Sequence, residues 1–252
     1  MFLLLAAAVA AQPRRVAVIA HRGEHIVRPE NTIPAFAEAI RLGADFIEVD
    51  VRTTSDGQLV LSHDATVDRC TNGRGRISEM TFEQVRALDA GAKKGPEFAG
   101  AKIPTFDEVL DLARGRTGIY VDAKAVSAKV LVRHIEQGGM AGNVVIYCGQ
   151  SLAREILAVN PNLKVMPEAN SLQETKQSLA ELHPKVIAFA DRDFKPEIVE
   201  AARQGGTLIY VDRLGLNDRP EGWQAAIEAG ADGIQTDRPG QLVEFLRAQG
   251  YR

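Results

Sequence analysis

Two histidines and two carboxylates stand near one another in the first quarter of the chain, in a pattern that suits acid–base chemistry. His21 ends an apolar segment, and His63 follows the apolar residues 59–61. Glu48 and Asp50 lie between them in the sequence. A single histidine at the end of a strand is more often structural. Two histidines on either side of a carboxylate cluster are typical of a general acid and a general base.

The carboxylates indicate a metal ion. Side chains alternate along a strand, so Glu48 and Asp50 share one face of their apolar segment, and Asp122 and Lys124 share one face of another. Two carboxylates on an apolar strand would be unstable in a dry core. Mg²⁺ or Ca²⁺ would stabilise them, because hard cations prefer oxygen ligands and accept water or a phosphate in the remaining positions. The alternative is a solvated or salt-bridged pair at a strand end.

The other three histidines carry weaker signals. His25 lies in a loop, and the sequence assigns it no role. His134 and His183 stand on or beside predicted helices, where we expect surface or packing roles.

The elements that must position these residues alternate between apolar strands and amphipathic helices. Eight near-continuous apolar segments, each followed by a helical pattern, favour a parallel sheet. Within this length they predict an α/β fold, a (β/α)8 TIM barrel, rather than an open doubly wound sheet. The predicted main strands are residues 16–20, 45–52, 118–124, 143–148, 163–168, 186–190, 207–211 and 233–237.

Active sites of such barrels lie at the carboxyl ends of the strands. Polar residues that end the predicted strands are His21, Glu48, Asp50, Asp122, Lys124, Glu168, Asp212 and Asp237. Residues 58–62 form a short extended return after the second strand. Residues from about 64 to 104 exceed what one βα unit needs, and we expect them to form a small insertion after strand two, over the mouth of the barrel.

Composition narrows the class of protein. The 252 residues fit a single barrel of about 250 residues. A net charge of −3, from 30 basic and 33 acidic residues, argues against a nucleic-acid partner. The two cysteines, Cys70 and Cys148, cannot make a disulfide framework; free thiols are favoured, with one disulfide as the alternative. No segment reaches the ~20 apolar residues of a membrane span, so stable membrane insertion is not expected, and the oligomeric state stays open.

The N-terminal residues 1–13 have the character of a signal segment. Residues 1–11 are apolar, and Ala8-Val9-Ala10 is a small-x-small cleavage pattern. We therefore expect a barrel over 14–252 and a periplasmic or secreted protein. The alternative is a cytoplasmic protein with a frayed apolar N-terminus.

Motifs between residues 20 and 75 resemble the glycerophosphodiester phosphodiesterase family in order and spacing. They are His21-Arg22-Gly23, Pro29-Glu30-Asn31-Thr32, Glu48-x-Asp50-Val51, Asp56-Gly57, His63-Asp64 and Thr71-Asn72-Gly73-x-Gly75. The segments 103–106, 120–124 and 232–239 are similar too. The resemblance implies a (β/α)8 barrel with a small insertion, which agrees with the strand count. It also implies hydrolysis of glycerophosphodiesters to glycerol 3-phosphate and an alcohol.

The resemblance also implies site residues. Glu48, Asp50 and Asp122 would be ligands of one divalent cation, Mg²⁺ or Ca²⁺, although the family more usually has Glu at the third position. Glu168 is a candidate to compensate for the shorter side chain. His21 and His63 would be the catalytic pair. Arg22 and Lys124 match the basic residues that hold phosphoryl oxygens. Glu30 would also bind substrate, and Glu30 and Asn31 would shape the first βα loop, with helix capping as the other interpretation.

Two segments depart from the family pattern. Tyr210-Val211-Asp212 stands where the family commonly has Trp-x-Asn, and residues 147–151 lack the usual Ser-Phe. Both would line the pocket around the leaving alcohol or the glycerol. Two other functions stay open: a phospholipase D-like enzyme acting on lysophospholipids or sphingolipids, and a non-catalytic binding barrel.

Overall fold

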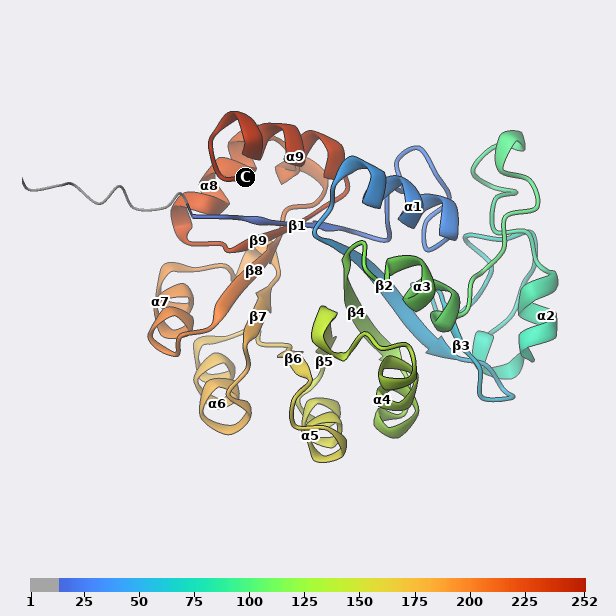
Figure 1. The fold of residues 1–252 in the computed structure, drawn as a ribbon, viewed down its shortest axis with the longest axis horizontal. Coiled ribbons are helices and arrows are strands. Elements are labelled where there is room, and N and C mark those ends of the chain that lie inside the picture. Colours follow the sequence, from blue (N-terminus) through green and yellow to red (C-terminus); the bar gives the residue numbers. More distant parts are fainter. Residues whose placement is uncertain (1–13) are drawn as a thin grey trace, which may run out of the picture.

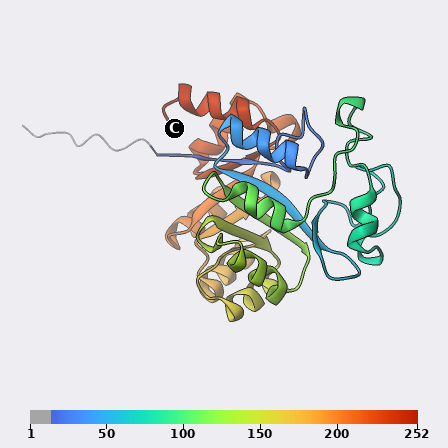
Figure 2. The same ribbon diagram turned by 45° about the vertical axis from the view of Figure 1, so that its right-hand side comes forward.

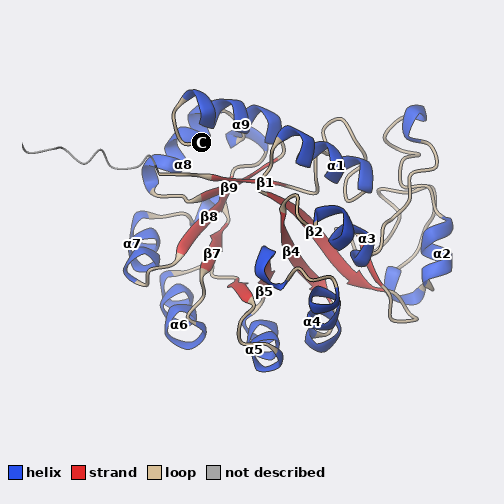
Figure 3. Ribbon diagram, in the orientation of Figure 1, coloured by secondary structure: helices blue, strands red, loops and turns tan. Residues whose placement is uncertain are grey.

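Eight parallel strands form the wall of the barrel, in the spatial order β6-β5-β4-β2-β1-β9-β8-β7. The ring is completed between β6 and β7 by a parallel bridge from Glu168 to Ala188. Figure 3 shows these strands surrounded by helices, in a computed structural model that describes residues 14–252. The predicted signal segment 1–13 lies outside the described residues. The strands of the ring are β1 Ala17–Ala20, β2 Phe46–Thr53, β4 Gly118–Ala125, β5 Val144–Cys148, β6 Lys164–Pro167, β7 Val186–Phe189, β8 Leu208–Asp212 and β9 Gly233–Thr236.

Each strand of the ring leads to a helix on the outside, as Figure 1 shows, so the predicted (β/α)8 barrel is confirmed. The first helix illustrates why these segments are helical. Its apolar residues recur at helical spacing and bury Phe36 and Ala39, and Gly43 ends it in a left-handed conformation with a φ of 94°. Truncation of Phe36 to Ala would cost about 3–5 kcal/mol. The outer helices are α1 Ile33–Leu42, α3 Phe106–Ala113, α4 Ala128–Gln137, α5 Gln150–Val159, α6 Leu172–Leu182, α7 Pro196–Gln204, α8 Pro220–Ala229 and α9 Pro239–Ala248.

Alternation along the strands separates an outer apolar layer from the barrel interior. In β2, Ile47, Val49 and Val51 belong to the main hydrophobic cluster that also contains the apolar faces of the helices. Glu48 and Asp50 have the opposite parity, so they face the inside of the barrel. This alternation places the two carboxylates where the barrel interior opens towards its carboxyl-terminal mouth.

The insertion after the second strand builds a small unit of its own. Strand β3 (Leu59–Leu61) pairs antiparallel with β2, and helix α2 (Phe82–Ala87) follows after a short 3₁₀ turn. Its small core contains Val60, Val67, Ile77, Val85, Ala90 and Ile103. Figures 1 and 2 both show this unit at the end of β2 and β3. Arg69 and Lys94 connect it to the loop between β1 and α1, so it borders the mouth of the barrel.

Candidate active site

Three carboxylates predicted to bind metal meet inside the barrel mouth. Strands β2 and β4 run in parallel register, with Asp50 opposite Asp122. Oxygen atoms of Glu48, Asp50 and Asp122 all lie within 4.8 Å of one another. Glu48 and Asp50 are 2% and 1% exposed. The arrangement offers one oxygen-rich site made by two neighbouring strands.

The electrostatics of these carboxylates favour a bound cation. Burial, followed by the charges of Asp50 and Asp122, raises the pKa of Glu48 well above its usual value. Burial also raises the pKa of Asp122, although the ammonium group of Lys124 counteracts it. The Nζ atom of Lys124 lies 2.5 Å from Asp122 Oδ2 and 3.4 Å from Asp50 Oδ1. Three carboxylates, two of them buried, thus converge beside Lys124 and Arg22, and such oxygen donors suit a hard divalent cation.

The loop after β1 places Arg22 beside this cluster. The backbone N–H of Arg22 donates to Glu48 Oε2 at 2.7 Å, and its Nε lies 3.6 Å from Asp50 Oδ2. This buried Nε has no hydrogen-bond partner among the described residues. Gly23 follows with a φ of 79°, and a Cβ there would lie 2.7 Å from the backbone of Ala35. Only glycine fits this turn, which explains the His-Arg-Gly string in structural terms.

Asn31 holds the loop to the second strand. Its Nδ2 donates to Asp50 Oδ2 at 2.7 Å, and its Oδ1 accepts from the backbone N–H of Asp50 at 3.2 Å. The N-cap residue of α1 is Thr32, whose side chain makes no capping hydrogen bond. The capping interpretation of Asn31 is therefore wrong. Its φ of 54° turns the side chain towards Asp50 instead.

Glu30 is engaged by two arginines. Arg22 Nη1 donates to Glu30 Oε1 at 3.2 Å, and Arg69 donates to both carboxylate oxygens at 2.7 Å. Burial alone would raise the pKa of Glu30, but the hydrogen bond from Arg69 and the charge of Arg22 bring it down to about 2. Glu30 therefore positions the guanidinium group of Arg22. Its predicted contact with substrate stays a prediction.

Each predicted catalytic histidine is held by a carboxylate through Nδ1. His21 Nδ1 donates to Asp237 Oδ1 at 2.7 Å, and His63 Nδ1 donates to Asp64 Oδ1 at 2.7 Å. Such a bond fixes the ring and leaves Nε2 free for proton transfer. Burial lowers the pKa of His21, although the hydrogen bond to Asp237 opposes the shift. The catalytic roles of both histidines stay predictions.

Asp237 is itself held by residues that the sequence analysis did not single out. Asp218 is buried, and its Oδ2 accepts from the backbone N–H of Asp237 at 2.8 Å. Its other oxygen accepts from Trp223 Nε1 at 2.8 Å and from Thr236 Oγ1 at 2.5 Å. Asp218 lies in the loop between β8 and α8, beyond the end of the strand, so a search of the strand ends did not single it out.

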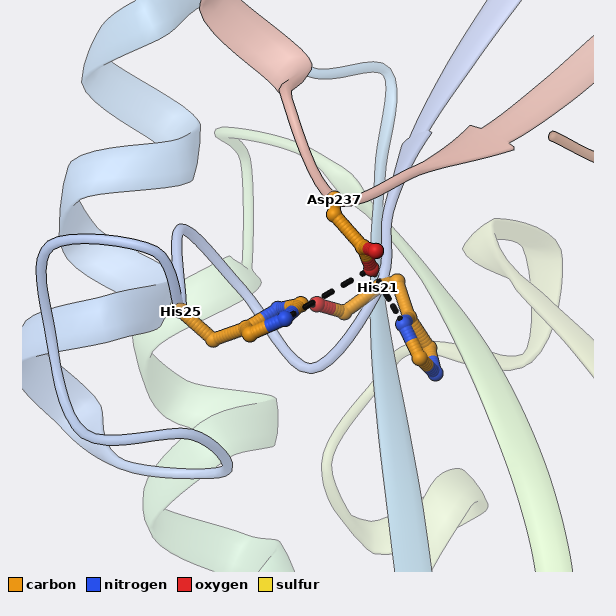
Figure 4. A group of neighbouring side chains, drawn as sticks. All are labelled: His21, His25 and Asp237. Carbon is orange, nitrogen blue, oxygen red and sulfur yellow. Dashed lines mark hydrogen bonds and ion pairs between the residues drawn. The ribbon is translucent and has the colours of Figure 1, made fainter. Parts of the chain in front are cut away.

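His25 also belongs to this group. Its Nδ1 donates to the backbone oxygen of His21 at 2.7 Å, and its Nε2 lies 3.5 Å from Asp237 Oδ1. Figure 4 shows both imidazole rings directed at the carboxylate of Asp237.

Residues at the ends of the remaining strands lie around this cluster. Burial, and then the charge of Asp122, raises the pKa of Asp212 to about 7. Glu168 is not part of the cluster of Glu48, Asp50 and Asp122. Its Oε1 accepts a hydrogen bond from Asn170 Nδ2 at 3.3 Å.

The structure also shows where His134, His183 and the two cysteines lie. His134 pairs with Asp107, and His183 ends α6, so the structure gives both the peripheral positions that were expected. Cys70 and Cys148 are both free thiols, as the composition favoured.

A cavity of about 200 Å³ lies between the β1–α1 loop and the insertion. Its polar lining is mostly basic: His25, Arg69, Lys93 and Lys94, with Glu30 as the acidic member. Glu30 also contacts Arg22, so the cavity adjoins the carboxylate cluster.

Carboxylate, imidazole and cationic side chains gather at the carboxyl ends of the strands, where (β/α)8 enzymes have their active sites. The fold and the site therefore place the protein in the class of (β/α)8 barrel enzymes. Residues 21–140 match the Glycerophosphoryl diester phosphodiesterase family. The chain is 36% identical to a glycerophosphodiester phosphodiesterase of Caldanaerobacter subterraneus, over 92% of this chain and 98% of that protein. It therefore belongs to the glycerophosphoryl diester phosphodiesterase family, as the motifs indicated.

Further relatives agree. A glycerophosphodiester phosphodiesterase of Bacillus subtilis is 31% identical over 79% of this chain and 76% of its own length. The crystal structure of an Agrobacterium tumefaciens glycerophosphodiester phosphodiesterase superposes with a TM-score of 0.80 at 30% identity, covering 89% of this chain and 98% of that one. A phosphodiesterase of Oleispira antarctica, solved with the product sn-glycerol-3-phosphate, shares the fold with a TM-score of 0.84 at 21% identity, over 92% of this chain and 96% of that one.

Among residues 14–252, no helix has the length and apolar character needed to cross a membrane.

Proposed function

We propose that the chain hydrolyses glycerophosphodiesters to glycerol 3-phosphate and an alcohol, with the help of one divalent cation. The names of its relatives indicate the reaction. One observation carries the proposal. Three converging carboxylates share the barrel mouth with two histidines, each of which donates a hydrogen bond to a further carboxylate.

Glu48, Asp50 and Asp122 would hold the cation, Mg²⁺ or Ca²⁺. Their buried, mutually repelling carboxylates are hard oxygen donors of the kind that these ions prefer. When bound, the cation supplies positive charge that stabilises a phosphodiester and its transition state. The two hydrogen bonds between Asn31 and Asp50 would hold this carboxylate in the orientation that the site needs.

Arg22 and Lys124 would bind the phosphoryl oxygens. Within residues 14–252, the buried Arg22 Nε has no hydrogen-bond partner and lies 3.6 Å from Asp50 Oδ2, so the guanidinium group stands beside the proposed cation site. The ammonium group of Lys124 lies between Asp50 and Asp122, at the edge of the proposed cation site. A phosphate that reaches the cation would therefore meet both cationic side chains.

His21 and His63 would transfer the protons. The sequence indicates no Ser, Cys or Thr of the site as an activated nucleophile. The glycerol of the substrate, however, carries a hydroxyl next to the phosphoester carbon. That hydroxyl would attack phosphorus and give its proton to one histidine. The bond from phosphorus to the leaving alcohol would break, and the other histidine would protonate the departing oxygen.

Water would then open the resulting cyclic glycerol phosphate, with the two histidines in exchanged roles. An attack within the substrate is favoured because the reacting groups are already close, which can supply about 7–11 kcal/mol of the barrier. The product is glycerol 3-phosphate, and both histidines return to their starting states.

A screen of glycerophosphodiesters with different alcohols, with and without chelator, tests the proposal through release of glycerol 3-phosphate. Hydrolysis that stops in chelator and returns with Mg²⁺ or Ca²⁺ supports it. Hydrolysis of lysophospholipid in vesicles, with no reaction of the water-soluble diesters, would favour the phospholipase D-like function instead. Tight metal binding with no turnover of any diester would favour a binding barrel.

A further inference from the structure

A second group of potential metal ligands lies beside the proposed catalytic site. It consists of His21, His25 and Asp237, whose ligand atoms all lie within 4.8 Å of one another (Figure 4). We propose that these residues form a binding site for a zinc ion, separate from the carboxylate cluster, and that zinc bound there inhibits the enzyme. The binding stands on geometry alone, whereas the inhibition rests on the proposed function of His21.

The hydrogen bonds fix the ring of His25 with a lone pair facing an acid. Its Nδ1 lies 2.7 Å from the backbone oxygen of His21, and a carbonyl oxygen can only accept, so Nδ1 carries the proton. In the neutral ring Nε2 is then an acceptor, and it points at Asp237 Oδ1 from 3.5 Å. Two acceptors that face each other at this distance are suited to a cation placed between them.

The spacing suits a small tetrahedral ion. Zinc bonds of about 2.0–2.1 Å place neighbouring tetrahedral ligands roughly 3.3 Å apart. The separation of His25 Nε2 and Asp237 Oδ1, 3.5 Å, is close to that value. His21 Nδ1 lies 2.7 Å from the same oxygen, so it would lose its proton and move back by about 0.6 Å.

Solvent can reach all three side chains, which are between 14% and 21% exposed. A water molecule would therefore provide the fourth ligand. Asp218 accepts from the backbone N–H of Asp237 and holds the segment that carries the carboxylate ligand, which is the kind of support that metal sites use.

The two sites differ in the metals that they prefer. Two imidazoles and one carboxylate form a donor set typical of zinc. Glu48, Asp50 and Asp122 offer oxygen only, which suits Mg²⁺ or Ca²⁺. Zinc would therefore occupy the histidine site even when an excess of Mg²⁺ or Ca²⁺ fills the carboxylate site.

Zinc at this site would stop proton transfer by His21. The ion would take the place of the proton that Nδ1 donates to Asp237, and the neutral ring would then carry its one proton on Nε2. The ring then has no free nitrogen with which to accept a proton from a nucleophile. Inhibition follows from coordination of the ring, without displacement of the cation at the carboxylate site.

Cobalt(II) tests the site directly, because its visible absorption reports tetrahedral coordination and does not depend on activity. Metal-free protein in saturating Mg²⁺ is titrated with Co²⁺ as the wild type and as His25→Ala, Glu48→Gln and His134→Ala. We expect the tetrahedral absorption in the wild type, in Glu48→Gln and in His134→Ala, and its loss in His25→Ala. Circular dichroism checks that each variant is folded.

Inhibition by Zn²⁺ is measured in parallel, relative to the zinc-free rate of each active variant. The half-inhibitory Zn²⁺ concentration should rise at least about tenfold in His25→Ala and stay unchanged in His134→Ala. The proposal is overturned if His25→Ala keeps the cobalt spectrum, if Glu48→Gln loses it, or if zinc inhibits His25→Ala as strongly as the wild type. If no diester were hydrolysed, the proposed function would fail while the cobalt titration still decided the metal site.

Discussion

Asn31 and Asp50 are joined by hydrogen bonds in both directions: the side-chain amide donates to Asp50 Oδ2 at 2.7 Å and accepts from the backbone N–H of Asp50 at 3.2 Å. The pair ties the loop after β1 to the centre of β2. It leaves Asp50 Oδ1, which lies 3.4 Å from Lys124 Nζ, on the side of the other carboxylates. The orientation of one proposed metal ligand therefore depends on a residue of a different element.

The first prediction concerns this pair. Asn31→Ala removes the hydrogen-bond partner of Asp50 Oδ2 and of the Asp50 backbone N–H, both buried, which should lower the free energy of unfolding by about 1–3 kcal/mol. Metal affinity should fall as well, because Asp50 loses its fixed orientation. Urea denaturation and calorimetric titration with Mg²⁺ or Ca²⁺ measure the two effects. Asn162→Ala, at an exposed position, is the control. An Asn31→Ala protein with unchanged stability and affinity would contradict the prediction.

The second prediction concerns the carboxylate cluster. Glu48→Gln removes one of the three carboxylates that offer oxygen atoms to the site, so metal affinity should fall by at least about tenfold and hydrolysis should be lost. Stability in chelator should not fall, because the substitution removes repulsion from Asp50 and Asp122. Calorimetric titration and thermal denaturation measure both. Glu168→Gln lies outside the cluster and should keep the affinity. Full activity of metal-free wild-type protein would show that the cluster serves another purpose.

The third prediction concerns the two histidines. General acid–base groups contribute about 10²–10⁴-fold each, so His21→Ala and His63→Ala should each lower kcat by that factor in a folded barrel. His134→Ala should have no effect, because its partner Asp107 lies on α3, outside the site. Steady-state kinetics under saturating metal provide the measurement. A His63→Ala enzyme that keeps more than about a third of the wild-type kcat would exclude this role.

The fourth prediction concerns the nucleophile. A substrate analogue that lacks the hydroxyl next to the phosphoester carbon should bind with similar affinity but react far more slowly, because attack within the substrate is no longer available. Competition against the parent diester measures binding, and product release measures turnover. Equal rates for the analogue and the parent would identify water as the direct nucleophile and eliminate the cyclic route.

The fifth prediction concerns pH and Arg69, which donates to Glu30 and to Asp64. The hydrogen bond from Arg69 lowers the pKa of Asp64 to about 2, and Arg69 and Arg22 bring that of Glu30 to about 2. Both carboxyls bind a proton more weakly in the folded protein than in the unfolded chain. Their ion pairs therefore stabilise the fold fully above the ordinary carboxyl pKa values of about 4, and the stabilisation is lost as pH falls towards 2.

Arg69→Gln should accordingly lower the free energy of unfolding by on the order of 1 kcal/mol at pH 6, since the half-exposed guanidinium is screened by water. The difference from the wild type should shrink between pH 4.5 and pH 2. Urea denaturation across this range measures it, and Arg192→Gln, a solvent-exposed arginine, is the control. A difference that grows as pH falls would have the wrong sign.

Local sequence patterns predicted the barrel and part of its candidate site. Alternation of apolar segments and helical spacing predicted the eight-stranded barrel, because a strand buried on both faces and a helix buried on one have different periods. The same alternation put Glu48 and Asp50 on one face of their strand. The helix α2 inside the insertion was not predicted, although Thr81 and Gln84, which form its capping box, were a usable signal.

The contacts between distant segments could be found only in the tertiary structure. Asp237 meets His21 because β9 pairs with β1, two strands more than 200 residues apart. Asn31 was open to interpretation as a helix cap because its residue type suits one, but a left-handed backbone directs it to Asp50. Residue types and strand periodicity determined which chemistry this chain offers. The register between strands and the path of the loops decided which groups meet, because those depend on packing across the whole barrel.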